Sequence, residues 1–556
     1  MAEEHKYPMV EGISEFKRSL FDHQRTAIFR MEELEEKMEV ITSTSVISTN
    51  IGIFSDEAGY GKTLSLLGLI YRDKFKLTPD TRIPNNMNGY TLMTSFTIVD
   101  KTMIVCPLSI ILQWENEIKS NTSMDCVVIK NRKQITRVLP PEQIVIVTTT
   151  MYNEFITHNP TYIWKRLIVD EPDSLKIPSM VTPNYGFIWL VSSTIMYRTE
   201  NRQAKFIKEL TRIRNGDYAK FNICNPLAYV QSSVSIPPVN EIEHLIARPI
   251  MVRNALPYVS GAVRDMLLAG DIEGVMRSLS ATKSSTLMEV LEGNLKKKKR
   301  LWTFRLNHPG PNLTEEQLKV YRIDITKKLK DIALELKSIS EKSREVLQSD
   351  CPICCDTVSS QSVVTPCCQN IFCGKCLISW LGTNSSCPMC RANMGVNDMI
   401  MIDGDRKEED RKENDRKEND RKEEDSKENE LLSLQEKLHQ LISHNRDSGR
   451  KWIIASNYEN IVFKLVHLLR DFNCAEMKGS ITRRNKILKK FKEGDIDVII
   501  LNSKYSGAGI NLYMATDVVL YNRFESDLEY QCIHRGQRIG RTSPLNVHTF
   551  KEIQRE

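Results

Sequence analysis

Short apolar runs rich in β-branched residues recur in two separate parts of the chain, with amphipathic stretches between them. In the first 240 residues, these runs are Met103–Ile110, Gln143–Thr150 and Arg166–Asp170. After residue 430, they are Lys451–Ser456, Asp497–Asn502 and Asp517–Asn522. Runs this short and this apolar are typical of strands buried on both faces, as in a parallel sheet covered by helices. The pattern therefore predicts two α/β units, at residues 1–240 and 431–556.

The residues between the two α/β units differ in composition. Residues 241–345 are rich in Leu, Lys and Glu and are predicted to form a helical linker. They include the basic run Lys296–Arg300, which fits an exposed helix face or loop, a phosphate contact or a nuclear-import signal. Residues 346–396 hold a cysteine cluster. Residues 397–430 contain a charged repeat of period five without apolar positions, so we expect a spacer, either disordered or stiffened by Glu–Lys pairs four residues apart.

Cysteine usage indicates both the compartment and the chemistry of the cluster. Nine of the 14 cysteines lie between Cys351 and Cys390. The first ten residues lack the basic and apolar segments of an export signal, and no apolar run approaches the ~18 residues of a membrane-spanning helix. We therefore expect an intracellular protein whose clustered cysteines bind zinc rather than forming disulfides. The net charge of +6 only weakly indicates a polyanionic partner.

The segment Ile51–Ser65 has the pattern of a nucleotide-binding loop: an apolar strand, a loop with Gly59 and Gly61, and a helix start. Such a loop points backbone N–H groups at phosphates, with the positive end of the helix behind them. Lys62 is expected to reach the outer phosphates and Thr63 to hold Mg²⁺. The generic pattern has glycine at position 56, where this chain has aspartate. A plain glycine-rich turn is therefore the alternative interpretation of this segment alone.

Two further segments supply charged groups that ATP hydrolysis needs. Asp170 and Glu171 follow an apolar run, at the carboxyl end of a predicted strand, where ligands bind in open α/β sheets. Asp170 is expected to bind Mg²⁺, and Glu171 to polarise the attacking water. Arg535 and Arg538 share one helical face and are expected to neutralise charge on the γ-phosphate. Taken alone, these segments also fit an ordinary loop and a solvated helix, but the upstream glycine loop favours an ATP site.

The order of these segments and the residues in them resemble those of the Swi/Snf-type ATPases of helicase superfamily two. Leu20–Gln24 resembles the family's adenine-reading motif, and Asp56 matches the family's DE-x-G-x-GKT form of the loop. Three further segments resemble later motifs of the family: Ile104–Ile118, Ser503–Asn522 and Arg535–Gly540. The resemblance implies two RecA-like lobes with parallel sheets that close on one ATP and move along double-stranded DNA. The nucleotide contacts that it implies are Gln24, Asp56, Gly59, Gly61, Lys62 and Thr63.

Two positions depart from the family pattern. Asp173 stands where the family has the histidine of DEAH or DEGH, and Ser192–Ile195 lacks the proline of the third motif. Both positions help couple hydrolysis to movement in the family. The resemblance therefore leaves the efficiency of this coupling open.

Eight of the clustered cysteines form four pairs, which indicates two zinc ions, because zinc takes four ligands and a C-x-x-C pair places two sulfurs on one ion. The pairs are Cys351 with Cys354, Cys367 with Cys368, Cys373 with Cys376, and Cys387 with Cys390. The pattern resembles a RING finger, whose cross-brace implies one site from the first and third pairs and another from the second and fourth. Asn370 replaces the usual RING histidine, and Cys355 is a rival ligand.

A RING finger implies a ubiquitin-conjugating enzyme as a partner. The family's contact positions for this enzyme match Ile353, Trp380 and Pro388, and Arg391 matches the arginine that hydrogen-bonds ubiquitin. A purely structural zinc module is the alternative. A RING between the lobes characterises the HLTF-like remodelling and repair translocases, and the compact chain resembles helicase-like proteins of large DNA viruses.

Together these features predict an ATP-dependent translocase on double-stranded DNA that uses ATP, Mg²⁺ and two Zn²⁺ ions and carries a RING with ubiquitin ligase activity. One alternative is a ubiquitin ligase whose lobes only target it to DNA. The other is a non-catalytic scaffold, which has no need of Glu171 or the paired arginines. The expected compartment is the nucleus or a viral replication compartment.

Overall fold

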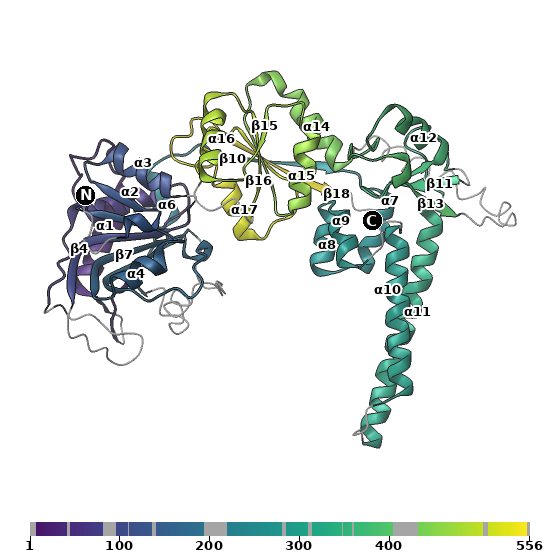
Figure 1. The fold of residues 1–556 in the computed structure, drawn as a ribbon, viewed down its shortest axis with the longest axis horizontal. Helices are drawn as coiled ribbons and strands as arrows, with labels where there is room; N and C mark the ends of the chain where they lie inside the picture. The colour runs from purple at the N-terminus through teal and green to yellow at the C-terminus, as the bar shows by residue number, and fades with distance from the viewer. Residues whose placement is uncertain are drawn as a thin grey trace.

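The molecule consists of two α/β lobes and a third body that carries a long helical hairpin. Figure 1 shows these three parts in a row, with the hairpin of α10 and α11 extending from the third. The computed structural model describes residues 7–41, 45–79, 81, 96–108, 110–135, 141–193, 220–280, 285–309, 314–346, 348–358, 361–403, 432–503 and 510–552.

The first lobe is a seven-stranded sheet in the order β5-β6-β4-β7-β8-β3-β9, and every neighbouring pair of described strands in it is parallel. Its strands are β3 (Ile51–Phe54), β4 (Thr97–Cys106), β5 (Cys126–Ile129), β6 (Ile144–Thr148), β7 (Tyr162–Asp170), β8 (Asn184–Val191) and β9 (Asn222–Ile223). Its helices are α1 (Asp22–Lys37), α2 (Lys62–Arg72), α3 (Ile111–Asn121), α4 (Tyr152–His158) and α6 (Leu227–Ser233), with short 3-10 turns at Arg132–Gln134 and Pro172–Ser174. The short strands β1 (Glu39–Ile41) and β2 (Val46–Ser48) pair separately. The parallel sheet predicted from the apolar runs is confirmed.

The second lobe is a six-stranded parallel sheet in the order β10-β18-β17-β14-β16-β15. Its strands are β10 (Val239–Ile246), β14 (Trp452–Ser456), β15 (Cys474–Glu476), β16 (Val498–Asn502), β17 (Asp517–Leu520) and β18 (Leu545–Glu552). Its helices are α14 (Leu434–His444), α15 (Glu459–Leu468), α16 (Ile481–Glu493) and α17 (Ser526–Ile533), with a 3-10 turn at Arg446–Ser448. The three apolar runs predicted in this lobe are β14, β16 and β17.

Strand β10 belongs to the second lobe although it precedes the predicted range 431–556. It pairs with β18 over its whole length, from Val239 opposite Leu545 to Ile246 opposite Glu552. As an edge strand it is only partly covered, so its sequence alternates with Asn, Glu and His instead of forming an apolar run. That is why the apolar pattern did not reveal it.

Most of the predicted helical linker, 241–345, forms helices from Ile250 onwards, whereas its first residues belong to β10. The helices are α7 (Ile250–Ala255), a 3-10 turn at Leu256–Tyr258, α8 (Gly261–Leu268), α9 (Ile272–Ser278), α10 (Leu287–Asn307) and α11 (Glu315–Val346). In α11, the buried residues Ile325, Ile332, Ile339 and Val346 recur every seven positions. A seven-residue spacing keeps the apolar side chains on one side of a helix, so α11 packs along α10 as a two-helix hairpin.

The cysteine-rich segment folds as a small body at the base of this hairpin. It contains the antiparallel sheet β12-β11-β13, with β11 (Gln361–Val364), β12 (Ile371–Cys373) and β13 (Ile400–Asp403), the helix α12 (Gly374–Thr383) and a 3-10 turn at Val396–Asp398. Strand β13 extends the body past the predicted end at residue 396. Val363, Phe372 and Leu377 share one apolar core with α7 to α11, so the two segments pack as one unit.

Two expectations from the sequence concern extended segments. None of the helices in the described part of the chain is both long enough and apolar enough to span a membrane. The charged repeat at 405–429 falls outside the described residues, and its interpretation as a spacer stays a prediction.

Candidate functional site

The loop between β3 and α2 depends on two glycines in the left-handed region of backbone conformation. Gly59 has a φ of +85° and Gly61 a φ of +82°. Space is also restricted: a Cβ on Gly59 would lie 2.5 Å from the carbonyl oxygen of Gln537, and one on Gly61 would lie 2.5 Å from Nε2 of Gln24. Glycine is therefore required at both positions. Gly61 is also the N-cap of α2, so the loop leads directly into the positive end of that helix.

Gln24 connects the start of α1 to this loop. Its side-chain oxygen accepts a hydrogen bond from Phe21 N at 2.9 Å, and its Nε2 donates to the Gly61 carbonyl oxygen at 3.1 Å. The side chain is buried and lines the pocket above the loop. Its predicted contact with the adenine base stays a prediction.

Lys62 opens α2 with its ammonium turned back over the loop. Its Nζ donates to the carbonyl oxygens of Asp56 at 2.8 Å and Glu57 at 3.3 Å. Burial lowers the pKa of Lys62, and the carboxylate of Glu171 is the largest of the charges that oppose this shift. The ammonium is thus held in the pocket by neutral acceptors, which an anion can replace with stronger, charge-assisted bonds.

Asp56 is buried and hydrogen-bonded to Asn225. Its carboxylate accepts hydrogen bonds from the backbone N of Asn225 at 2.7 Å and from Asn225 Nδ2 at 2.9 Å. Burial raises the pKa of Asp56, and these hydrogen bonds oppose the shift. Asp56 does not line the pocket within the described part of the chain. These hydrogen bonds brace the loop against the segment after β9, and nothing in the sequence singled out Asn225. The predicted contact of Asp56 with the nucleotide stays a prediction.

Asp170 and Glu171 lie where β7 ends, as their order in the sequence predicts. Trp114 Nε1, from α3, donates a hydrogen bond to Asp170 Oδ2 at 2.9 Å. Burial raises the pKa of Asp170, and the Trp114 hydrogen bond opposes the shift. Glu171 adopts a φ of +51°, which is rare for a residue other than glycine and is typical of functional sites. Both carboxylates line the pocket that contains Lys62.

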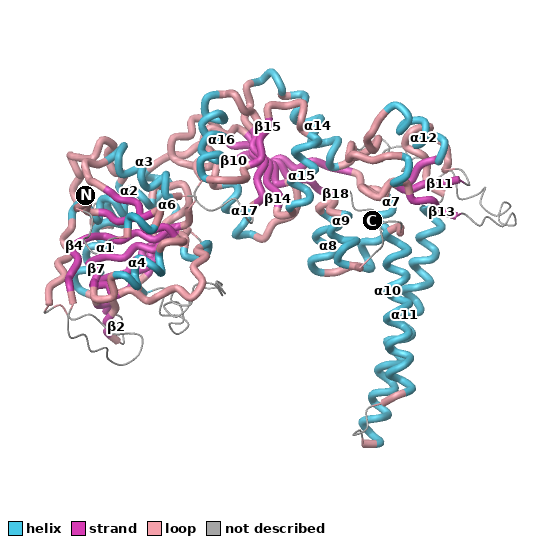
Figure 2. The backbone as a smooth tube through the Cα atoms, viewed as in Figure 1, coloured by secondary structure: helices cyan, strands magenta, loops and turns pink. Residues whose placement is uncertain are grey.

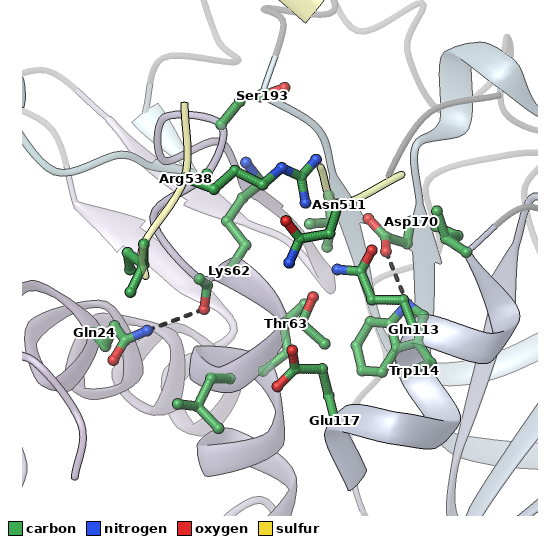
Figure 3. A pocket seen from close by; sticks show the side chains of 18 of the residues that line it. Gln24, Lys62, Thr63, Gln113, Trp114, Glu117, Asp170, Ser193, Asn511 and Arg538 are labelled. Carbon is green, nitrogen blue, oxygen red and sulfur yellow. Dashed lines mark hydrogen bonds between the residues drawn. The ribbon is translucent and has the colours of Figure 1, made fainter. Parts of the chain in front are cut away.

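The second lobe contributes Arg538 to the same pocket. Figure 3 shows Arg538 beside Lys62, with Asn511, also from the second lobe, between them and Asp170. Arg538 Nε donates to the His534 carbonyl oxygen at 2.8 Å, and burial lowers the pKa of Arg538 to about 10. Lys62 and Arg538 therefore line a common cleft. The predicted ATP site between the lobes requires such a cleft.

Arg535 lies deeper than Arg538. Its side chain is 3% exposed, and it does not line the pocket within the described residues. Burial lowers the pKa of Arg535, while Cys532 and the carboxylate of Glu171 oppose the shift. Contact of Arg535 with a phosphate stays a prediction.

The two lobes meet at the glycine loop itself. Ile539 N donates to the Gly59 carbonyl oxygen at 3.2 Å. Tyr530, from α17, accepts a hydrogen bond from Ala58 N at 3.0 Å and donates one to the Glu57 carboxylate. The loop that is expected to bind phosphates is therefore also the contact between the lobes.

Several pocket residues were not assigned a role from the sequence. Gln113 and Trp114 line the pocket and lie in the segment Ile104–Ile118, which resembles a family motif but indicates no role for either residue. Asn511 also lines it and lies in Ser503–Asn522, another segment that resembles a family motif. Gln113 Oε1 is buried without a hydrogen-bond partner among the described residues, as expected for a polar atom that faces a ligand. The side chain of Asp173, residues 194–195 and residues 504–509 lie outside the described residues.

The eight paired cysteines form two clusters in the predicted interleaved arrangement. One cluster is Cys351, Cys354, Cys373 and Cys376, and the other is Cys367, Cys368, Cys387 and Cys390. Within each cluster, the sulfur atoms all lie within 4.8 Å of one another, which suits four thiolates around one tetrahedral ion. Cys355 is exposed and belongs to neither cluster. Asn370, at the usual histidine position, donates from Nδ2 to Cys368 Sγ at 3.1 Å, so it contacts a ligand instead of serving as one.

The predicted contact surface for a ubiquitin-conjugating enzyme is partly open. Ile353 and Trp380 are each 37% exposed, and Pro388 is half-buried. Arg391 is exposed, but its guanidinium donates to His439 Nε2 in α14 at 3.1 Å. Lys464 Nζ also donates to the Cys367 carbonyl oxygen at 3.4 Å, so the cysteine-rich body contacts the second lobe.

Comparison with known families matches three parts of the chain. Residues 23–184 match the SNF2-related domain, residues 433–543 the helicase conserved C-terminal domain, and residues 349–391 the ring finger domain. The chain therefore carries the SNF2-related domain and the helicase C-terminal domain expected of a Swi/Snf-type ATPase, together with a ring finger. Its RING finger lies between the two ATPase domains, as the order of the motifs predicts.

Similar proteins are distant in sequence. The chain is 24% identical to the putative helicase R592 of Acanthamoeba polyphaga mimivirus, over 96% of this chain and 74% of that protein. It is 23% identical to the DNA repair protein RAD5A of Arabidopsis thaliana, over 90% of this chain and 56% of that protein. Among solved structures, the Sulfolobus solfataricus SWI2/SNF2 ATPase core in complex with dsDNA aligns with 98% of this chain and 90% of its own, at 14% identity and a TM-score of 0.31. The chain thus spans about half the length of RAD5A.

Proposed function

We propose that this chain hydrolyses ATP to ADP and phosphate in the pocket between its lobes and uses the cycle to move along double-stranded DNA. The observation that carries the proposal is that one pocket is lined by Lys62, Asp170 and Glu171 from the first lobe and by Arg538 from the second. Because both lobes contribute side chains to the pocket, ATP hydrolysis depends on the position of one lobe relative to the other. A motor requires this coupling between hydrolysis and lobe movement.

The side chains of the pocket suit successive parts of the nucleotide. The N–H groups of the loop and the start of α2 face the phosphates, and Lys62 exchanges its carbonyl acceptors for phosphate oxygens. Gln24, fixed to the loop, contacts the base. The hydroxyl of Thr63 and the carboxylate of Asp170 are oxygen donors of the kind Mg²⁺ prefers, and this ion would neutralise phosphate charge.

Hydrolysis needs a positioned water and cations near the γ-phosphate. Glu171 orients and polarises the water from the end of β7. Arg538 stabilises the charge that develops on the γ-phosphate, and Arg535 supports it from behind. DNA as the track is supported by the Swi/Snf family and by relatives named as DNA repair proteins.

We also propose that the RING binds two zinc ions and recruits a ubiquitin-conjugating enzyme. The two cysteine clusters fit this requirement, because each offers four sulfur atoms at distances that suit one tetrahedral ion. The exposed side chains of Ile353 and Trp380 offer an apolar contact on the RING surface. Ligase activity is therefore a second function of the same chain.

Two reciprocal variants test both proposals. Lys62→Ala should lower duplex-stimulated ATP hydrolysis at least ~100-fold, because it removes the cation on the phosphates, and should leave ubiquitin-chain synthesis intact. Ile353→Ala should abolish ubiquitin-chain synthesis and leave duplex-stimulated ATP hydrolysis intact. ATP turnover is measured with duplex, with single-stranded DNA and without DNA.

Each outcome decides between the candidate functions. ATP hydrolysis that survives Lys62→Ala would refute the assigned site. Chain synthesis abolished by Ile353→Ala beside undetectable ATP turnover in the wild type would favour a ligase whose lobes only target it to DNA. Absence of both ATP hydrolysis and ubiquitin-chain synthesis in the wild type would favour a non-catalytic scaffold.

A further inference from the structure

The hairpin of α10 and α11 extends away from the rest of the molecule. Figures 1 and 2 show its base beside α7 and the RING, while its far end has no neighbouring element among the described residues. At 1.5 Å per residue, the 32 residues of α11 span about 48 Å. Only the side facing α10 is needed for packing, where Ile325 and Ile332 are buried. The outer surface of this far end is free to bind a partner.

This far end is strongly basic. Within its described residues, 296–309 and 314–328, there are ten Lys and Arg side chains and three carboxylates, a net charge of +7. The whole chain carries +6, so the end of the hairpin alone exceeds the net charge of the protein. Mutual repulsion of clustered cations opposes folding, and either internal carboxylates or a bound external anion would relieve it.

Internal carboxylates do not neutralise the cluster. In the described part of the chain, only Lys296 and Lys328 of these ten residues form an ion pair, with Glu292 and Asp324. Lys297, Lys298, Lys299 and Arg300 are exposed. Since successive residues of a helix point about 100° apart, these four cations surround α10 instead of lying along one face. Cations in all directions suit the phosphates on both sides of a DNA groove better than the single face of a protein partner.

Apolar and aromatic side chains lie among these cations. Leu301 is 49% and Phe304 60% exposed, and the ring of Phe304 stacks on His308 with centroids 4.3 Å apart. Trp302 lies under Arg305, at 4.9 Å from the ring centroid, and under Lys328, at 4.7 Å. Cations interleaved with flat rings are typical of nucleic-acid-binding surfaces, where they contact phosphates and the sugars or bases beside them.

We propose that the far end of the hairpin, residues 296–309 and 314–328, is a second, sequence-independent binding surface for duplex DNA, in addition to the motor lobes. The inference rests on the proposed function, because that function brings DNA to the molecule. A contact on a rigid arm would keep the protein on its track while the lobes change position between ATP cycles. Binding through phosphates predicts little dependence on sequence and strong dependence on salt.

The experiment compares two quadruple variants of the full chain that lose the same charge. The test variant is Lys297→Ala, Lys298→Ala, Lys299→Ala and Arg300→Ala, and alanine preserves the helix. The control variant is Lys37→Ala, Lys76→Ala, Lys130→Ala and Arg132→Ala, four residues that are already paired with carboxylates in the first lobe. Affinity for a labelled duplex of about 40 base pairs is measured by fluorescence anisotropy between roughly 50 and 200 mM salt.

The test variant should bind the duplex at least about tenfold more weakly at low salt than the control variant. Its plot of log affinity against log salt should be flatter by about three to four units, because each lost phosphate contact removes ~0.9. A third variant, Lys297→Arg with Lys298→Arg and Lys299→Arg, keeps the charge and should retain wild-type affinity. Basal ATP hydrolysis without DNA should be the same in all of them.

Equal duplex affinity and salt dependence in the test and control variants would overturn the inference. So would selective loss of binding to poly-glutamate, the probe for an acidic protein partner, with duplex binding unchanged. Failure of duplex to stimulate the wild-type ATPase would instead count against the proposed motor function. The anisotropy comparison would still judge the hairpin in that case, so the two failures are distinguishable.

Discussion

At the scale of single residues, Asp170 shows how a site residue depends on a partner far away in the sequence. Its carboxylate is buried at the end of β7, and a buried carboxylate is costly unless it is hydrogen-bonded. Trp114, on α3, supplies that hydrogen bond at 2.9 Å. The bond keeps the oxygen atoms of Asp170 directed into the pocket, so Trp114 acts as a positioning residue for the proposed Mg²⁺ site.

Replacement of Trp114 by Phe should raise the Mg²⁺ concentration for half-maximal ATP hydrolysis about tenfold, because a hydrogen bond to a charged group is worth ~1.4 kcal/mol or more. The maximal rate at saturating Mg²⁺ should change less. Trp164→Phe is the control, since Trp164 is equally buried but lies in the core against Phe155. The same Mg²⁺ requirement in both variants would contradict the positioning role.

Many residues of the candidate site could be placed from the sequence, because consecutive residues stay together. Lys62 and Thr63 follow Gly61 at the start of α2, and Glu171 follows Asp170 at the end of β7. Asp56 shows the limit of this argument, since its position in the loop did not indicate its buried hydrogen bonds. Their donor, Asn225, is 169 residues distant and carries no motif.

At the scale of elements, Asp517 joins three strands of the second lobe. It begins β17, and its buried carboxylate accepts hydrogen bonds from His548 Nε2 in β18 at 2.9 Å and from Arg450, just before β14, at 3.2 Å. Thr516 and Asn546 also donate to it. Burial alone raises the pKa of Asp517, but hydrogen bonds, led by that from His548, outweigh it, and the pKa is lowered.

Asp517→Ala should destabilise the second lobe by ~3 kcal/mol near neutral pH, as expected when one partner of a buried charged network is removed. The lowered pKa means that the folded state favours the ionised form. This stabilisation is therefore fully present above the ordinary aspartate pKa of about 4 and is lost as pH falls through the lower folded-state value.

Hydrogen exchange of β17 in the wild type and the variant measures this difference, which should shrink below about pH 4. Asp447→Ala, at an exposed position, is the control and should have almost no effect. A difference that stays constant down to acid pH would show that the ionised carboxylate is not the source of the stability.

At the scale of the whole molecule, the RING is part of a larger folding unit. Its Val363 and Phe372 share an apolar core with α7 to α11, and Gln369 accepts a hydrogen bond from the first residue of α10, Leu287, at 3.0 Å. The cysteine clusters lie immediately beside this core. Zinc binding should therefore stabilise the hairpin base as well as the RING.

Removal of zinc by a strong chelator should cause joint loss of hydrogen-exchange protection in the RING, α7 and the base of the hairpin, because metal-binding free energy contributes directly to folding. The first lobe has its own core and should keep its protection. Cys373→Ser should reproduce the effect, whereas Cys355→Ser, outside both clusters, should not. Retained protection around α7 after zinc loss would contradict the shared unit.

The sequence by itself determined the chemistry of the sites and the positions of the central strands. The reason is that phosphate loops, cysteine pairs and strands buried on both faces are each formed by residues that are consecutive or close together in the chain. Only the tertiary structure decided which distant segments meet. It placed β10 in the second lobe, turned Asp56 towards Asn225 and joined the RING to the hairpin base. The pairing of edge strands, buried polar contacts and domain packing all depend on residues far apart in the chain. Local patterns of apolar and polar residues therefore do not predict these contacts.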